Sequence, residues 1–306
     1  MVPDHAPVPG GGDFASAEAV NALYGDPRLA RAIRATAFGL ASMYHGRHLL
    51  NWLIDDRGRM LLGYLAIYLH ATRDRSDPAS GLTPTRIKAL CSEFDVCSPG
   101  RAGAMLSLMR FSGYLAPDIE IADRRQRRLV ATDKLYALLR SRLKLHYTAM
   151  APLFDDGPAM FAALDDKIVD GALVEAMVKR YRAGFRLVAA APGLGLFGER
   201  NGGIMILMSL IAAGDDDDTV PPSRPVPISI AALARRFAVS RPHVLKLIRE
   251  AEEQGFLERP GPDLRVVILK PALIEATRRF FATSYLFLAD SMREAMAVTE
   301  RRRKAG

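Results

Sequence analysis

The spacing of apolar residues along the chain predicts a protein made mainly of helices. Over most of its length apolar residues recur every three or four positions, the period of a helix that buries one face. Two short pieces, 113–132 and 256–269, lack this period and are predicted to be extended. The predicted helices cover 28–55, 58–72, 85–94, 98–112, 133–150, 165–190, 204–213, 229–238, 241–254 and 271–300. The expected fold class is therefore mainly α, with small β-hairpins.

Proline, glycine and acidic residues divide the chain into an arm and two units. The first 14 residues hold three prolines and three consecutive glycines, so we expect residues 1–17 to be a disordered arm. The turn-forming sequence from Pro152 to Pro158 separates a first unit, 18–152, from a second unit, 153–306.

The second unit repeats the first. Shifting the sequence by 143 residues aligns 57–111 with 200–254 without a gap and gives 11 identities, against about 3 expected by chance. Apolar positions match as well, for example Met105 with Ile248. After position 111 one residue must be dropped to keep the register. Identity, apolar register and element order together indicate an internal duplication.

The clearest local pattern lies at 228–269. Ser229 is placed to cap a short helix, and after a tight turn Ser240 is placed to cap a second helix that ends at Gly255. The second helix carries one apolar stripe, and two short strands joined by a Pro- and Gly-rich turn follow it. Two helices joined by a short turn and followed by a hairpin form a winged helix-turn-helix.

The tract FAVSRPHVLKLIREAEEQGFLER, residues 237–259, resembles bacterial winged-helix regulators. With long helices before and after each winged unit, the arrangement is most similar to the MarR family, over roughly 28–150 and 165–300. The resemblance implies two winged helix-turn-helix units whose flanking helices interlock as they do between the subunits of a MarR dimer. Because both units stand in one chain, it also implies a covalent pseudo-dimer.

Basic residues concentrate on the elements that a winged helix turns toward DNA. The whole chain has a formal net charge of +8, and residues 98–150 alone hold ten basic and four acidic residues. No acidic residue lies between Arg235 and Arg249. This distribution is typical of a DNA-binding protein. The first unit fits less closely, because its second helix contains Gly100 and Gly103 and few side chains that reach bases.

We expect each recognition helix to enter a major groove with its N-terminal residues at the base edges. Arg241 is the best candidate for a bidentate contact to guanine, worth about 1–3 kcal/mol of discrimination. The arginines of the first wing are expected to meet phosphates or the adjacent minor groove. The expected DNA-binding residues are Ser98, Arg101, Ser107, Arg124, Arg125, Arg127, Arg128, Arg235, Arg236, Ser240, Arg241, His243, Lys246 and Arg265.

Other function classes find little support. The two cysteines are too few for a disulfide framework or a structural zinc site, and the six histidines show no ligand spacing, so neither metal nor cofactor is expected. No apolar run reaches the ~20 residues needed to cross a bilayer, and the N-terminus lacks a secretory signal. Nothing resembles a catalytic triad or a carboxylate pair, so we expect no enzyme. The expected location is the cytoplasm, on the nucleoid.

Three motifs have competing interpretations. Cys97 aligns with Ser240 at a helix start, where a thiol pKa would be lowered, so a redox switch and a plain cap substitution both stand. The G-x-G-x-x-G string at 193–198 follows no strand, so it is interpreted as a joint between helices rather than a dinucleotide site. The four aspartates at 215–218 are interpreted as a solvated linker rather than a cation site.

Aromatic residues cluster in the helices before the first winged unit. Tyr44, His48, Trp52, Tyr64 and Tyr68 form this cluster. An aromatic core between long helices explains it. The alternative is a pocket for a small, aromatic effector, since MarR-like proteins often bind inducers between the helical body and the winged unit.

The sequence therefore predicts a sequence-specific regulator of transcription, a repressor, that binds double-stranded DNA at an imperfect inverted repeat. It would act as a monomeric pseudo-dimer or as a further homodimer. One alternative is a plasmid-type replication initiator with tandem winged helices, which would bind direct repeats. Another is a protein-interaction scaffold, which would need neither the basic wing nor the cations at 235–249.

Overall fold

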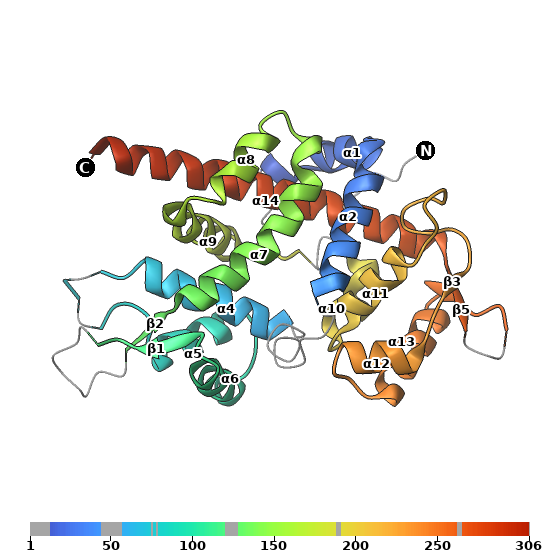
Figure 1. Cartoon of the computed structure of the whole chain (residues 1–306), viewed down its shortest axis with the longest axis horizontal. Helices are drawn as coiled ribbons and strands as arrows, with labels where there is room; N and C mark the ends of the chain where they lie inside the picture. The colour runs from blue at the N-terminus through green and yellow to red at the C-terminus, as the bar shows by residue number, and fades with distance from the viewer. Residues whose placement is uncertain are drawn as a thin grey trace. The chain divides into compact units, whose positions relative to one another are not determined.

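The protein is mainly helical in the computed structural model, which confirms the expected class for the part of the chain it describes (Figure 1). The described residues are 13–43, 57–74, 76–77, 79–119, 128–187, 191–261 and 265–305. The α-helices are α1 (Ala17–Gly25), α2 (Arg28–Met43), α4 (Arg57–Ala71), α5 (Pro84–Glu93), α6 (Pro99–Phe111), α7 (Asp133–Met150), α8 (Gly157–Ala163), α9 (Lys167–Arg182), α10 (Gly195–Glu199), α11 (Gly203–Ala212), α12 (Ile230–Arg236), α13 (Arg241–Glu253) and α14 (Pro271–Ala305).

Most helix ends fall within a few residues of those predicted. Helix α9 ends at Arg182 rather than near 190, just before the positive-φ residue Gly184, and residues 44–55 of the predicted helix 28–55 lie outside the described residues. The expected boundary after Pro152 instead holds a short 3-10 turn and helix α8, in which Pro158 is the second residue. The G-x-G-x-x-G string contributes a 3-10 turn, Pro192–Leu194, and the short helix α10, so the segment is helical rather than an open joint. Proline at the start of a helix fits, because the first turn needs no N–H partner there.

Two small antiparallel sheets accompany the helices. Strands β1 (Leu115–Pro117) and β2 (Leu129–Ala131) pair with each other. Strands β3 (Val226–Pro227), β4 (Leu257–Glu258) and β5 (Val266–Leu269) form a sheet in the order β3-β5-β4. An isolated bridge joins Leu82, just before α5, to Leu129 of β2. Strand β3 likewise lies just before α12, so each sheet includes a contact with the residues that precede its helix pair.

The chain forms two compact units, and each is assembled from three separated segments. Unit 1 comprises Met1–Asp56, Leu145–Pro158 and Gly184–Leu288, and unit 2 comprises Arg57–Lys144, Ala159–Ala183 and Ala289–Gly306. The units therefore do not coincide with the contiguous division into 18–152 and 153–306. The reason is packing: flanking helices from each half of the chain contribute to the core of the unit built around the other half's helix pair.

The core of unit 1 lies where α2 packs on α11 and on the N-terminal part of α14. Leu29 and Ile33 on α2 are fully buried, as are most side chains of α11. The Thr36 hydroxyl and the Tyr285 hydroxyl share a hydrogen bond of 2.8 Å inside this core. This pair of hydroxyls is therefore satisfied where it is removed from water, as burial requires.

The core of unit 2 lies where α4 packs on α9. A glycine on α9 makes close packing possible, because a Cβ added at Gly171 would lie 2.9 Å from the Cβ of Ala71. The C-terminal part of α14 joins α9 through the guanidinium of Arg180, which pairs with Asp290 and Glu294. Within the described ranges, none of the helices is both long and apolar enough to span a membrane.

Candidate functional site

The same local architecture occurs once in each unit. We call α5, α6, β1 and β2 the first segment, and α12, α13, β4 and β5 the second segment; each consists of two helices followed by a paired strand hairpin (Figure 1). All four helices begin behind a hydroxyl N-cap, at Thr83, Ser98, Ser229 and Ser240. Each cap oxygen accepts a hydrogen bond from a first-turn N–H, which satisfies a group that the helix leaves unpaired.

Residues with positive φ fix how the two segments correspond. Asp95 (φ 50°) and Ala238 (φ 52°) lie in the turn between the helices and are 143 positions apart. Gly113 (φ 74°) and Gly255 (φ 72°) end the second helix of each pair and are 142 positions apart. The first segment therefore has one additional residue between the helices of its pair, and the gap expected after position 111 lies in this turn instead.

Cys97 is the additional residue. Val96 and Val239 occupy equivalent places, because their N–H groups donate to Cys91 and Ala234 at the end of the preceding helix. The next equivalent pair is formed by the two N-caps, Ser98 and Ser240. The alignment of Cys97 with Ser240 was therefore wrong.

The buried stripes of α6 and α13 confirm this shift. The stripe of α6 is Ala102, Met105, Leu106 and Met109, and that of α13 is Val244, Leu247, Ile248 and Ala251, each pair 142 apart. Met105 thus corresponds to Leu247, not to Ile248. The identity of Pro99 with Pro242 is not an equivalence either, since Pro99 is the first residue of its helix and Pro242 the second.

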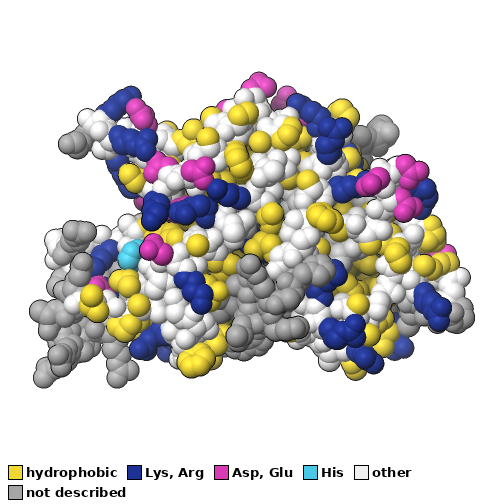
Figure 2. All heavy atoms as spheres, in the orientation of Figure 1, with side chains coloured by type: hydrophobic (Ala, Val, Ile, Leu, Met, Phe, Trp, Pro, Cys, Tyr) yellow, Lys and Arg dark blue, Asp and Glu magenta, His cyan; other side chains and the backbone are white. Residues whose placement is uncertain are grey.

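The outward face of α13 is cationic. Lys246 and Arg249 are exposed along it, opposite the buried stripe, and Arg241 is exposed at the start of the helix. Figure 2 shows Lys and Arg side chains gathered over α12 and α13. The acids of the same helix are mostly engaged. Arg200 donates to Glu250 at 2.7 Å, with the Lys246 amine 3.8 Å from the same carboxylate, and Glu252 binds Arg259.

The outward face of α6 is nearly neutral at the equivalent positions. These are Pro99, Gly100, Ala104, Ser107 and Phe111, all exposed. The Phe111 side chain is 91% exposed, and Figure 2 shows hydrophobic atoms at the surface over α6. The Ser107 hydroxyl donates to the Gly103 carbonyl at 3.1 Å. The two cations of α6, Arg101 and Arg110, are also exposed, at the positions equivalent to His243 and Glu252.

Several residues expected to contact DNA hold local structure. Ser98 and Ser240 accept the N–H groups of Arg101 and His243 as helix caps. The His243 ring also makes a hydrogen bond of 2.9 Å to the Asn201 carbonyl. Of the remaining candidates in the second segment, Arg235 and Arg265 are exposed and Arg236 is half-buried.

The base of the first hairpin corrects the expectation for Arg128. Its side chain is 5% exposed and lies 3.9 Å from the carboxylate of Asp118, which is itself 3% exposed. Arg73 reaches the same carboxylate at 2.9 Å, and the Asp118 N–H donates to the Arg128 carbonyl. Arg128 is therefore a buried structural residue rather than a phosphate contact. The other three wing arginines, Arg124, Arg125 and Arg127, lie outside the described residues.

The aromatic cluster is only partly described. Tyr44, His48 and Trp52 lie outside the described residues. Burial raises the pKa of the Tyr64 hydroxyl, with the nearby Arg142 acting in the opposite direction. The Tyr68 hydroxyl accepts a hydrogen bond of 2.8 Å from Arg182, whose guanidinium also lies over the Tyr68 ring. Both tyrosines thus belong to the packing of α4.

The two cysteines are adjacent, and their environment disfavours a reactive thiolate. Cys91 is buried on α5, and burial raises its pKa to about 12. Burial also raises the pKa of Cys97, although a hydrogen bond with Cys91 acts in the opposite direction. The lowered pKa expected from a place at the helix start was wrong, because Ser98, not Cys97, is the cap.

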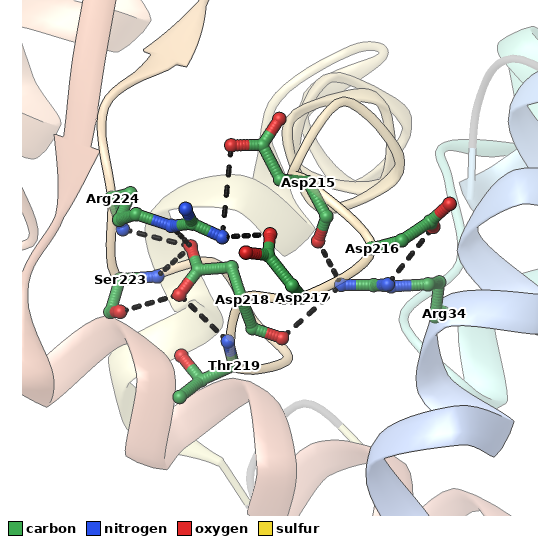
Figure 3. Close-up of polar contacts among 8 residues, drawn as sticks. All are labelled: Arg34, Asp215, Asp216, Asp217, Asp218, Thr219, Ser223 and Arg224. Atoms are coloured by element: carbon green, nitrogen blue, oxygen red, sulfur yellow. Dashed lines mark hydrogen bonds and ion pairs between the residues drawn. The ribbon is translucent and has the colours of Figure 1, made fainter.

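The acidic turn after α11 is organised by two arginines and one buried carboxylate (Figure 3). Asp215, Asp216 and Asp217 are largely exposed, whereas the Asp218 side chain is 5% exposed. Burial acts to raise the pKa of Asp218, but hydrogen bonds from Ser223 and from the backbone N–H groups of Arg224, Thr219 and Ser223 outweigh it and lower the pKa to about 2. Arg34 and Arg224 bind the turn from either side.

Asp215, Asp216 and Asp217 therefore behave as the predicted solvated linker, whereas the buried Asp218 is a structural residue that fixes the turn. Among the described residues, no group of three or more His, Cys, Asp or Glu side chains is arranged to hold a metal ion.

No protein-family model, no curated protein and no solved structure matches this chain.

Proposed function

We propose that this protein is a sequence-specific, double-stranded DNA-binding regulator of transcription that acts as a repressor. The observation that carries the proposal is the outward face of α13. Of its three exposed cations, Arg241 stands at the start of a capped helix, and Lys246 and Arg249 line the side opposite the buried stripe. A row of cations on a helix fits the charge and width of a major groove.

In this proposal both segments are winged helix-turn-helix units similar to those of the MarR family. Each has a capped helix pair, a residue in the left-handed conformation in the turn, and an antiparallel hairpin after the second helix. The shared landmarks support a duplication. The interleaved composition of units 1 and 2 supports a single-chain pseudo-dimer whose flanking helices are exchanged between halves.

The roles of the α13 cations follow from their positions. Arg241 is the first residue of the helix, where recognition helices meet base edges, and its guanidinium suits the O6 and N7 atoms of guanine. Lys246 and Arg249 lie five and eight residues further along the helix and are assigned to phosphates or further base edges. Repression would follow from occupation of a promoter in the nucleoid.

The test is selection of genomic DNA fragments by the purified protein at two salt concentrations, followed by sequencing. Enrichment of an imperfect inverted repeat upstream of genes, weakening steeply with salt, is the expected result. The triple variant R241A/K246A/R249A should lose that enrichment. A variant with three exposed basic residues removed from α14, R301A/R302A/R303A, controls for the loss of charge alone.

Other outcomes identify other functions. Direct repeats at a single origin-like locus would indicate a replication initiator. Retention of DNA fragments without sequence preference and without salt dependence would contradict DNA recognition. The protein-interaction scaffold would then be the remaining function.

A further inference from the structure

We infer that the two second helices read chemically different half-sites: α13 a half-site that contains guanine, and α6 a half-site rich in thymine. The inference rests on the proposed function and specifies its DNA target. It starts from the register set by the positive-φ residues, which places each outward position of α6 opposite a known position of α13.

In that register every cation of the α13 face has a small or apolar counterpart on α6. Arg241 corresponds to Pro99, Lys246 to Ala104 and Arg249 to Ser107. Both rows are exposed, so the difference lies in chemistry and not in accessibility. Pro99 and Ala104 offer no side-chain donor and Ser107 only a short one, so these three positions cannot form the bidentate contacts that long side chains make with guanine or adenine.

The remaining chemistry of the α6 row is apolar. In the major groove the thymine C5-methyl group is the apolar feature that a side chain such as alanine can contact. The Ala104 methyl group is exposed in the middle of α6, and the Pro99 ring is exposed at the start of the helix, five residues before it. These groups would cover thymine methyls, whereas Ser107 contributes one hydroxyl that can bond to either base of a pair.

Small residues also permit close approach of the helix backbone. A Cβ added at Gly100 would meet no atom within 4 Å, so this position is open to the surface. Gly103 differs, because a Cβ there would lie 3.3 Å from the side chain of Lys88. Gly100 is therefore the place where the α6 backbone can come nearest to a base pair, which short contacts to methyl groups require.

The experiment uses the full-length protein and the duplex obtained by selection. Thymines of one half-site at a time are replaced by uracil, which removes only the methyl group, and guanines by 7-deazaguanine, which removes the N7 acceptor. We expect uracil to weaken binding about fourfold for each contacted methyl in the half-site bound by α6, and 7-deazaguanine to weaken binding in the other half-site.

A charge variant assigns the effect to α6. A104K installs the lysine of α13 in α6 and should abolish the sensitivity to uracil. A89K, which adds the same charge at an exposed position of α5, should retain it. Circular dichroism of both variants confirms folding.

The inference and the proposed function fail differently. A symmetric operator with guanine in both half-sites, or binding unchanged by uracil in either half-site, would overturn the inference while the regulator stands. Absence of any sequence-specific complex would overturn the proposed function itself.

Discussion

The first and second segments share a frame and differ on the surface. Their N-caps, their left-handed turn residues and the buried stripes of α6 and α13 coincide position by position. Their outward faces do not, since α13 presents three cations where α6 presents proline, alanine and serine. The frame is set by local hydrogen bonds and apolar burial, which restrict the residue at each position, whereas the outward residues are exposed and can differ without loss of the frame.

The hairpins differ in the same way. In the first segment β1 ends at Pro117 and β2 begins at Leu129, while β4 and β5 are closer in sequence, ending at Glu258 and beginning at Val266. A buried carboxylate with two arginines closes the longer hairpin, whereas a half-exposed Glu252–Arg259 pair closes the shorter one. The longer hairpin is thus the one whose base is held by the more deeply buried ion pairs.

The largest expected effect is the loss of that buried closure. D118A would leave Arg73 and Arg128 without their shared carboxylate, and we expect a loss of about 3–5 kcal/mol in the free energy of unfolding. Urea unfolding followed by circular dichroism measures it. The matched variant E252A breaks a pair whose side chains are 24% and 29% exposed, so it should cost less than about 1 kcal/mol. Equal losses would contradict the contrast.

The next effect separates the two second helices in binding. R241A should weaken the specific complex about 5- to 150-fold, because a bidentate contact to guanine is worth about 1–3 kcal/mol. R101A, which removes an exposed arginine of α6, should reduce affinity for specific and random DNA equally. Fluorescence anisotropy on both duplexes measures this. A larger loss of specificity from R101A would reverse the assignment.

A smaller effect concerns the turn between the helices. Ala238 has a φ of 52°, a conformation that costs a residue with a Cβ about 1–2 kcal/mol. A238G should therefore stabilise the protein, by up to about 1 kcal/mol after the entropy cost of glycine. D95G should gain less, since aspartate tolerates this conformation better. Thermal unfolding of the two variants compares them, and a larger gain from D95G would be unexpected.

The smallest effect is a difference in pH dependence between the units. Asp218 in unit 1 has a pKa lowered to about 2, so its stabilisation is present above the unfolded value of about 3.9 and is lost as pH falls through 2. Burial raises the pKa of Asp170 in unit 2, against its hydrogen bond with Arg140. Stability linked to Asp170 is therefore greatest below about pH 3.9 and declines as pH rises above it.

Two asparagine variants test this difference in acid-unfolding titrations. D218N should flatten the loss of stability between about pH 4 and 2. D170N should leave that region unchanged and remove the decline at higher pH. The same response from both variants would contradict the opposite shifts.

The features found from sequence are the local ones. Helix α13, its cap and its buried stripe follow from periodicity and from Ser240, because these signals lie within one helix. The register of the first segment was missed because the identity of Pro99 with Pro242 outweighed the cap signal of Ser98. Burial of Arg128 was missed because its partner Asp118 stands across the hairpin, where no sequence spacing reveals it.

The interleaving of the units does not follow from the apolar pattern, for a related reason. Apolar periodicity shows that α2, α4, α9 and α11 each bury a face, but not which helix covers it. The pairs formed, α2 with α11 and α4 with α9, join residues about 100 or more positions apart. The resemblance to a dimer with interlocking helices supplied that idea; the amphipathic pattern alone did not.

The interleaved units also determine when the protein can fold during synthesis. Unit 1 needs segments that begin near the N-terminus and extend to Leu288, and unit 2 needs residues 289–306. Neither core can form while the ribosome is still translating the middle of the chain. The apolar face of α2 therefore stays exposed until α11 has been synthesised. Contacts of such long sequence separation slow folding and expose chains to aggregation. A chain whose two units are interleaved in this way therefore cannot complete one unit before the residues of the next are made.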